Sequence, residues 1–195
     1  MLVTGGLCLA SLAIPAFPQG APARRGQGVA ANVWAGITSV EGPGLIVTLK
    51  DSAQDVPAES DRDHLRVHEQ DLLGVINSLK AGGCEAMAIS SLRGKWYRIT
   101  FTTAFRDDDN GIRVNATVLK GPIRIAAIGD PRLMKAELFR RGGVVRRSGL
   151  EALKMITVTT ERTIRLPAAP TDRQPQHARP APRVAEPRGA DSDYN

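Results

Sequence analysis

The sequence contains little cysteine and few aromatic residues. Its 195 residues include only two cysteines, Cys8 and Cys84, which excludes a disulfide framework and a cysteine-rich metal site. Aromatic residues make up 4% of the chain and hydrophobic residues 42%, so the core of the single domain that this length predicts must consist mainly of Val, Ile, Leu and Ala. Cys84 follows two glycines into a strand-like segment and is predicted to be a buried, unreactive thiol.

Charged residues are absent from positions 1–23, where residues 7–14 are apolar except for Ser11. This pattern is typical of an export signal, with residues 21–23 as a small-residue cleavage site. Residues 1–32 are therefore predicted to form a signal-like or membrane-anchor segment and a linker. No basic residue precedes the apolar run, whereas Arg24 and Arg25 follow it, which favours retention of the C-terminal part in the cytoplasm. A cytoplasmic chain remains the alternative.

The C-terminal part of the chain has a different composition. Prolines recur there among Arg, Asp, Ala and Gln, and such a segment cannot bury enough apolar surface to offset its ordering entropy. Residues 167–195 are therefore predicted to be a proline-rich disordered tail, and residues 33–166 to be the folded domain.

The net charge of +6 is unevenly distributed. Residues 50–71 hold seven acidic and three basic residues, whereas residues 132–147 hold six basic residues and one acidic residue. The domain is predicted to be charge-polarised. A uniformly basic surface of the kind that binds nucleic acid is not indicated.

Turn residues and hydrophobic periodicity divide the domain into regular elements. Strands are predicted at residues 45–49, 86–90 and 123–128, with a terminal strand or hairpin over 155–166. One helix is predicted from His68 to Gly82-Gly83, and a second from Pro131 to Gly142-Gly143. Strands at residues 97–104 and 112–119 are predicted to flank the Asn110-Gly111 turn, a strong hairpin signal.

The predicted order is strand–helix–strand, a hairpin, then strand–helix–strand. It favours an α+β fold of ferredoxin-like type, in which two strand–helix–strand halves place two helices on one sheet with an inserted hairpin.

Four short motifs resemble those of the YlxW/YlxX-type family, bacterial domains of unknown function. They are Gly42-Pro43-Gly44 before a strand, His68 to Leu72 at a helix start, Ala81 to Ala86 at a strand entry, and Ala127-Ile128-Gly129-Asp130-Pro131 between a strand and a helix. The resemblance covers about residues 40–166. It implies a membrane-associated, extracytoplasmic module, often encoded near cell-division or envelope genes and without established enzymatic activity.

Two departures from the family pattern stand out. Family members usually carry a short coiled coil before this domain, and a coiled-coil arm is not expected from residues 1–40, since no heptad run precedes Glu41. Asp107, Asp108 and Asp109 form an apparent insertion.

The segment from Asp61 to Asp71 is the most enzyme-like part of the chain. His64 and His68 are spaced for a zinc pair on one helix, with Asp71 as a third ligand. In the competing interpretation His68 is the N-cap of a helix and Asp71 is its third residue, reaching back to the cap amide. Asp107, Asp108 and Asp109 suggest either a metal site or a solvated hairpin tip. Capping and solvation are favoured, so no catalytic residue, metal or cofactor is predicted.

The remaining motif residues are predicted to be structural joints. Asp130 is placed to N-cap the second helix, Pro131 occupies its first turn, and Gly129 precedes them. Gly42, Pro43 and Gly44 start the first strand.

Four arginines form the candidate interaction surface: Arg140, Arg141, Arg146 and Arg147. They suit an anionic partner, but cations are also favoured near a helix C-terminus for local reasons. The expected function is a non-enzymatic interaction module at the cell envelope, linked to cell division or envelope assembly, with a protein or envelope partner, self-association being a further option. The alternatives are a cytoplasmic domain that meets nucleic acid through these arginines, which is disfavoured because no aromatic residues interleave them, and a metal-dependent enzyme.

Overall fold

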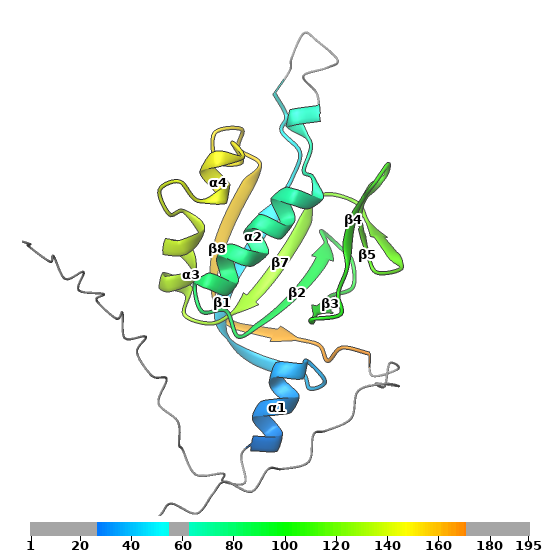
Figure 1. Cartoon of the computed structure of the whole chain (residues 1–195), viewed down its shortest axis with the longest axis vertical. Helices are drawn as coiled ribbons and strands as arrows, with labels where there is room; N and C mark the ends of the chain where they lie inside the picture. The colour runs from blue at the N-terminus through cyan, green and yellow to red at the C-terminus, as the bar shows by residue number, and fades with distance from the viewer. Residues whose placement is uncertain (1–26, 55–62, 171–195) are drawn as a thin grey trace, which may run out of the picture.

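The computed structural model describes residues 27–54 and 63–170 (Figure 1). Of the predicted signal-like segment and linker over residues 1–32, residues 1–26 lie outside these ranges, as does most of the predicted tail. Within them the protein has a mixed α+β fold with two antiparallel sheets, which confirms the α+β class. The elements are α1 (Gln27–Ala35), β1 (Val40–Leu49), a 3-10 turn (Asp63–Leu65), α2 (Glu69–Ala81), β2 (Ala86–Ser91), β3 (Tyr97–Ile99), β4 (Phe105–Asp108), β5 (Gly111–Val114), β6 (Thr117–Leu119), β7 (Ile123–Ile128), α3 (Pro131–Leu138), α4 (Val144–Arg147) and β8 (Ile156–Leu166).

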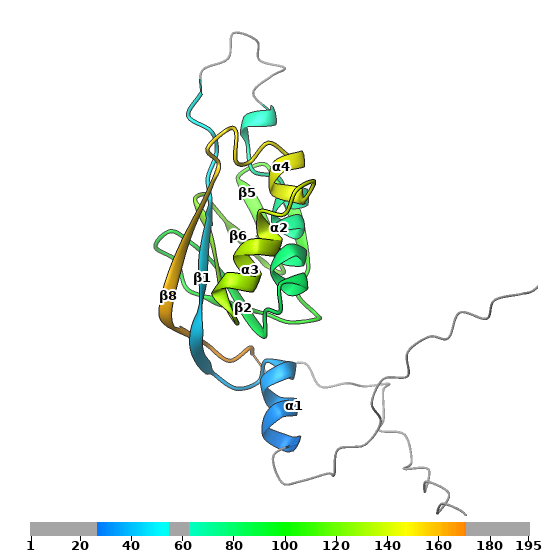
Figure 2. The same ribbon diagram turned by 90° about the vertical axis from the view of Figure 1, so that its left-hand side faces the viewer.

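The main sheet has five strands in the order β3-β2-β7-β1-β8, each antiparallel to its neighbours. Helix α2 connects β1 to β2, and α3 with α4 connects β7 to β8, so each helical connection passes over one intervening strand. Figure 2 shows these three helices on the same face of the sheet.

The core lies between this sheet and its helices. The side chains of β1 and β7 that face the helices are buried, and β7 is also buried on its other face, at Ala126 and Ile128. Helix α2 contributes one apolar stripe at helical spacing. Burying each such aliphatic side chain stabilises the fold by about 1.5–3 kcal/mol. The main members are Leu45, Val47, Leu49, Leu72, Val75, Ile76, Leu79, Ile125 and Ala127.

The Gly42-Pro43-Gly44 motif lies at a bulge of the β1–β8 pair, where Pro43 of β1 stands opposite two residues of β8, Arg162 and Thr163. The register between the two strands shifts between Gly42 and Gly44. Proline is tolerated at a bulge because no ladder hydrogen bond requires its missing N–H. Gly44 is pressed against β7, where a Cβ atom would overlap the carbonyl oxygen of Ala127. Residue 44 therefore has no room for a side chain.

Beyond the bulge, the β1–β8 pair turns across the other face of the main sheet (Figure 1). Ile164 and Leu166 of β8 are buried there against alanines of β2 and β7. The alanines make room for the overlying strand, and the bulge supplies the bend. The members of this second cluster are Ala86, Ala88, Ala126, Ile128, Ile164 and Leu166.

The predicted hairpin is a three-stranded sheet, in the order β4-β5-β6. The Asn110-Gly111 turn is present, since Asp108 pairs with Gly111 across it. The prediction of one strand over residues 97–104 was wrong: β3 ends at Ile99, because Thr103 Oγ1 accepts from the Thr100 amide and closes a turn. The predicted strand at 112–119 is also divided, at Asn115, whose φ of 52° cannot continue a strand.

The C-terminal segment is the single strand β8, which is one of the two predicted alternatives. Two helical elements differ from the prediction. The second predicted helix is divided into two helices, since α3 ends at Leu138 and α4 starts after Gly143. Helix α1 was not predicted. Buried Arg98 of β3 donates from Nη2 to the carbonyl oxygen of Val33 near its C-terminus, at 3.2 Å.

Among the described residues, no helix combines the length and the apolar character needed to cross a membrane. The longest, α2, has 13 residues.

Replacing Gly44 with Ala tests the bulge. The new Cβ meets backbone atoms of β7, so we expect destabilisation on the order of 1–3 kcal/mol in urea denaturation, the usual cost of overpacking. Thr48→Ala on the same strand is the control, and we expect it to cost less than about 1 kcal/mol. Equal midpoints for the two variants would contradict the close approach of β1 to β7.

Candidate functional site

The candidate interaction arginines lie at the end of α3 and on α4, and all four are exposed. We call Arg140, Arg141, Arg146 and Arg147 the basic ridge. Arg140 Nε donates to Glu137 Oε1 at 2.8 Å, and Arg146 Nε lies 3.4 Å from Glu151 Oε2. Within the described part of the chain, Arg141 and Arg147 form no salt bridge.

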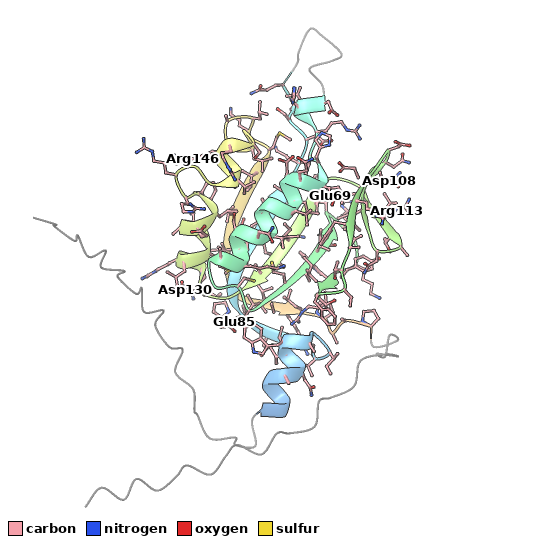
Figure 3. The ribbon with its side chains drawn as sticks, viewed as in Figure 1. Glu69, Glu85, Asp108, Arg113, Asp130 and Arg146 are labelled. Atoms are coloured by element: carbon pink, nitrogen blue, oxygen red, sulfur yellow. The ribbon has the colours of Figure 1, made fainter. Side chains whose placement is uncertain are left out.

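The basic ridge is held on α2. Val145 is fully buried, and Val144 packs on α2 at Gly74, where a Cβ atom would overlap the valine side chain. Gly74 costs about 1 kcal/mol of helix propensity relative to Ala, and it lets α4 approach closely. The charged groups of Arg146 and Arg147 therefore project from a packed element, and Figure 3 shows Arg146 beside α4.

A hollow of about 640 Å³ lies between the ridge and the start of α2. Arg146 and Arg147 line one side of it, and acidic residues with two histidines line much of the rest. We call it the α2-start hollow. Residues of the acidic segment (50–71) and of the basic segment (132–147) thus line the same hollow although they are far apart in the sequence. Arg140 and Arg141 are not among its lining residues. The lining is Asp63, His64, Arg66, His68, Gln70, Asp71, Asp107, Arg146, Arg147, Ser148, Gly149 and Leu153.

His68 is the N-cap residue of α2. Its backbone N–H donates to Asp71 Oδ2 at 3.1 Å, the reciprocal half of a capping box. The imidazole ring of His68 contacts two other residues. Nε2 lies 3.0 Å from the carbonyl oxygen of Asp63, and Nδ1 lies 3.5 Å from Asp107 Oδ2. The bond to the Asp63 carbonyl and the carboxylates of Asp63 and Asp107 raise the pKa of His68 above 6.5, against the opposing effect of burial.

Asp107 provides a tertiary cap that sequence reasoning missed. Its Oδ1 accepts from the backbone N–H of Glu69 at 2.7 Å, so a residue of β4 satisfies a free amide at the start of α2. Asp108 next to it accepts from the Asn110 amide and pairs with Arg113, and these two contacts lower its pKa. The only sequence signal was three successive aspartates beside a turn, and nothing in it indicated the helix that Asp107 reaches.

The suggested zinc ligands do not lie on one helix. His64 belongs to the 3-10 turn, whereas His68 caps α2 and Asp71 faces the cap amide. Among the residues that the structure describes, no group of three His, Cys, Asp or Glu side chains is placed to hold a metal ion.

The other motif residues meet at the opposite end of α2. The Gly129 N–H donates to the Pro43 carbonyl oxygen at 3.0 Å, and the Glu85 N–H to that of Ile128 at 2.8 Å. Asp130 is the N-cap of α3, where its Oδ1 accepts from the amides of Arg132 and Leu133, and Pro131 is the first residue of the helix. A hollow of about 630 Å³ lies over this junction, and Glu85 and Asp130, both labelled in Figure 3, line it.

The described residues offer no paired nucleophile and base. Burial raises the pKa of the Cys84 thiol to about 11, so the thiol is protonated at neutral pH, and it donates to the Ala86 carbonyl. The hydroxyl of Ser90 bonds to the carbonyls of Ser91 and Gly94, and that of Ser148 to the carbonyl of Val144. In this geometry the motif residues cap helices, and the hydroxyl groups bond to nearby backbone carbonyls. An exposed charged surface lies beside them.

The sequence profile of a bacterial family, described as "Bacterial protein of unknown function (DUF881)", matches residues 28–179. The chain is 26% identical over 113 residues to the UPF0749 protein YlxW of Bacillus subtilis (strain 168), a match that covers 58% of this chain and 46% of that protein. It is 29% identical over 114 residues to the UPF0749 protein Rv1825 of Mycobacterium tuberculosis, covering 58% of this chain and 35% of that protein. The chain therefore spans less than half the length of these curated relatives.

A solved structure also resembles the fold. It is the crystal structure of an uncharacterized conserved protein from Mycobacterium tuberculosis, with a TM-score of 0.63 and 25% sequence identity. The match covers 80% of this chain and 99% of that one. Together these matches confirm the predicted YlxW-type family.

The raised pKa of His68 predicts a pH-dependent contribution to stability. A group whose pKa is higher in the folded state stabilises the fold fully below its unfolded pKa, near 6.5, and loses that contribution as the pH rises through the folded value. We therefore expect His68→Gln to destabilise the protein more at pH 5.5 than at pH 8.5, in paired urea denaturations, with buffers on the order of one to two pH units either side of that pKa.

NMR titration of the His68 ring provides the direct measurement, with an expected pKa above 6.5. Asp107→Asn should lower it, because one of the facing carboxylates is lost. His64→Gln is the matched control and should leave the His68 titration in place. A His68 pKa at or below 6.5 would refute the ion-pair geometry.

Proposed function

The chain belongs to the DUF881 family of bacterial proteins of unknown function, and we propose that it is a non-enzymatic interaction module that binds an acidic protein partner through the basic ridge. In this proposal the module is held on the extracytoplasmic side of the membrane by its N-terminal segment. It takes part in envelope assembly or cell division.

The observation that carries the proposal is the rigid, exposed ridge itself. Four arginines project from the end of α3 and from α4, and the packing of Val144 on Gly74 fixes α4 against α2. Guanidinium groups bind carboxylates through paired hydrogen bonds, and their planar shape lowers the side-chain freedom lost per bond. Arg141 and Arg147 make no salt bridge within the described residues, which leaves their donors available to a partner.

The surroundings of the ridge favour a protein over nucleic acid. The α2-start hollow beside it carries Asp63, Asp71 and Asp107, and these carboxylates would repel a continuous phosphate backbone. A protein partner can place acidic groups on the arginines and basic groups on these aspartates. A second copy of this chain meets that requirement as well, so self-association is one outcome of the test.

The location rests on the sequence and on the family resemblance. Residues 7–14 are apolar except for Ser11, and no charged side chain occurs before residue 24, a composition typical of an exported or anchored segment. The absence of activity rests on the self-satisfied hydroxyls of Ser90 and Ser148 and on the protonated thiol of Cys84.

We also propose that the fold is of the ferredoxin-like type. Without the edge strand β3, the strand order is β8-β1-β7-β2, and each pair joined by a helix brackets one antiparallel neighbour. This is the arrangement that two interleaved strand–helix–strand units produce.

Replacing all four ridge arginines with Gln should weaken partner binding without unfolding the domain. Each change is on the surface and should cost on the order of 0.5 kcal/mol or less. Binding to proteins from a bacterial envelope extract should lose most of its salt dependence, because such pairing is screened within about 10 Å at 0.1 M salt. The measurement is capture at increasing salt, compared with retention on duplex DNA.

The matched control carries the same charge change elsewhere: Arg93, Arg106, Arg162 and Arg165, all exposed, are replaced with Gln. This variant should keep the wild-type salt profile. If both variants capture the same partners equally, the ridge is only a solvated surface. If DNA retention falls in the ridge variant alone, the partner is nucleic acid and the proposal fails.

The location is tested by fusing residues 1–40 to a reporter enzyme that is active only after export. We expect reporter activity, and we expect Leu9→Arg with Leu12→Arg to abolish it, because each central arginine costs about 2.5–3.5 kcal/mol during membrane insertion. An inactive reporter in the unaltered fusion would place the module in the cytoplasm.

A further inference from the structure

Large apolar side chains are exposed at the end of the molecule where α1 lies. Phe101 is 92% exposed, Trp34 is 69% exposed and Ile37 is 43% exposed. Single exposed apolar residues are common on proteins, but a group of them on neighbouring segments indicates a contact surface. We call these three residues the aromatic end.

Two segments distant in sequence form the aromatic end. Trp34 lies two residues before Gly36 and Ile37 directly after it, and a Cβ atom at Gly36 would lie 2.9 Å from Thr100 Cγ2. Thr100 is the neighbour of Phe101 in the chain. The α1 segment and the turn after β3 are thus in contact, and this contact brings the three side chains to one region.

Both segments are held in place by hydrogen bonds. Arg98 Nη2 donates to the Val33 carbonyl oxygen at 3.2 Å, and the Ala169 N–H donates to that of Gly36 at 2.8 Å. The turn that carries Phe101 is closed by Thr103, whose Oγ1 accepts from the Thr100 amide at 2.9 Å. The domain therefore presents Phe101 outward on a fixed turn. Contact of this apolar side chain with water is unfavourable, so burial against another apolar surface would stabilise the arrangement.

The position of the aromatic end in the chain indicates what covers it. Only 12 residues separate Ile14, the end of the apolar run, from Gln27, the start of α1. These residues span at most about 40 Å, so a bilayer that holds the apolar run keeps the start of α1, and with it the aromatic end, on the membrane side of the domain. Arg24 and Arg25 lie in the same linker and suit anionic headgroups. Trp and other aromatic side chains are favoured at the boundary between headgroups and acyl chains.

We propose that the aromatic end, Trp34 with Ile37 and Phe101, rests in the lipid headgroup region and sets the orientation of the domain on the membrane. The inference rests on the proposed membrane attachment and adds a direct contact of the folded domain with lipid. In both views of the molecule α1 and α4 lie at opposite ends (Figures 1 and 2). The contact therefore turns the outer end of the basic ridge away from the bilayer, toward a partner.

The experiment uses the full chain with Trp96→Phe, which leaves Trp34 as the one remaining tryptophan. The protein is mixed with vesicles of phosphatidylcholine and phosphatidylglycerol, with and without brominated acyl chains. Flotation reports membrane attachment, and quenching of Trp34 by bromine reports lipid contact. We expect flotation, a shift of Trp34 emission to shorter wavelength, and loss of that emission in brominated vesicles.

The controls separate a lipid contact from a folding effect. The difference between the emission of the wild type and that of Trp34→Phe gives the Trp34 emission in a protein whose Trp96 is unchanged. Emission of Trp96 in the Trp34→Phe variant should not be quenched, because Trp96 packs on the second buried cluster beside Arg124. Phe101→Ser should reduce Trp34 quenching while flotation persists. Leu133→Ser, at an exposed apolar residue of α3, should change neither.

The outcomes distinguish this inference from the proposed function. Flotation without quenching of Trp34 overturns the lipid contact and leaves the membrane attachment in place. A shift of emission without quenching, together with a doubled mass in light scattering, overturns it in favour of a second copy covering the aromatic end. Failure of the protein to float overturns both the attachment and the contact.

Discussion

The close approach of β1 to β7 at the Gly42-Pro43-Gly44 bulge is the constraint on which the rest of the structure depends. Gly44 leaves no space for a side chain beside Ala127, and the Gly129 amide closes the junction onto Pro43. The bulge also allows the β1–β8 pair to bend over the alanines of β2 and β7. One backbone feature thereby fixes the centre of the sheet, the entry to α3 and the cover on the second face.

The start of α2 is a second point at which distant segments are joined. His68 contacts Asp63 in the preceding turn and Asp107 in β4, and Asp107 in turn satisfies the Glu69 amide. The free amides of a helix start need acceptors, and here a carboxylate from the second sheet supplies one. The three-stranded sheet is therefore attached to the helical layer by polar contacts as well as by the buried side chains of Ile112, Val114 and Leu119.

The two ends of the molecule differ in chemistry. Around α4 and the start of α2 the surface is strongly charged, with arginines facing aspartates across a hollow. Around α1 the surface exposes Trp34 and Phe101. A charged surface gives specificity and rapid encounter with a partner, whereas an aromatic surface suits a boundary between polar and apolar phases. Our proposals assign these two requirements to separate ends of one small domain.

The sequence by itself determined the α+β class, the helix starts at His68 and Asp130, the Asn110-Gly111 turn and the family, because these depend on local backbone preferences and on the spacing of apolar residues. It did not determine the ends of β3, the split of the second helix, or the role of Asp107. Thr103 and Asn115 interrupt strands through local bonds and a positive φ that apolar periodicity does not register. Only the tertiary structure decided which distant segments meet, as Asp107 does with Glu69 and Gly36 with Thr100, and that Arg146 lines the same hollow as the acidic start of α2. Contacts between residues far apart in the chain leave no periodic signal in the sequence.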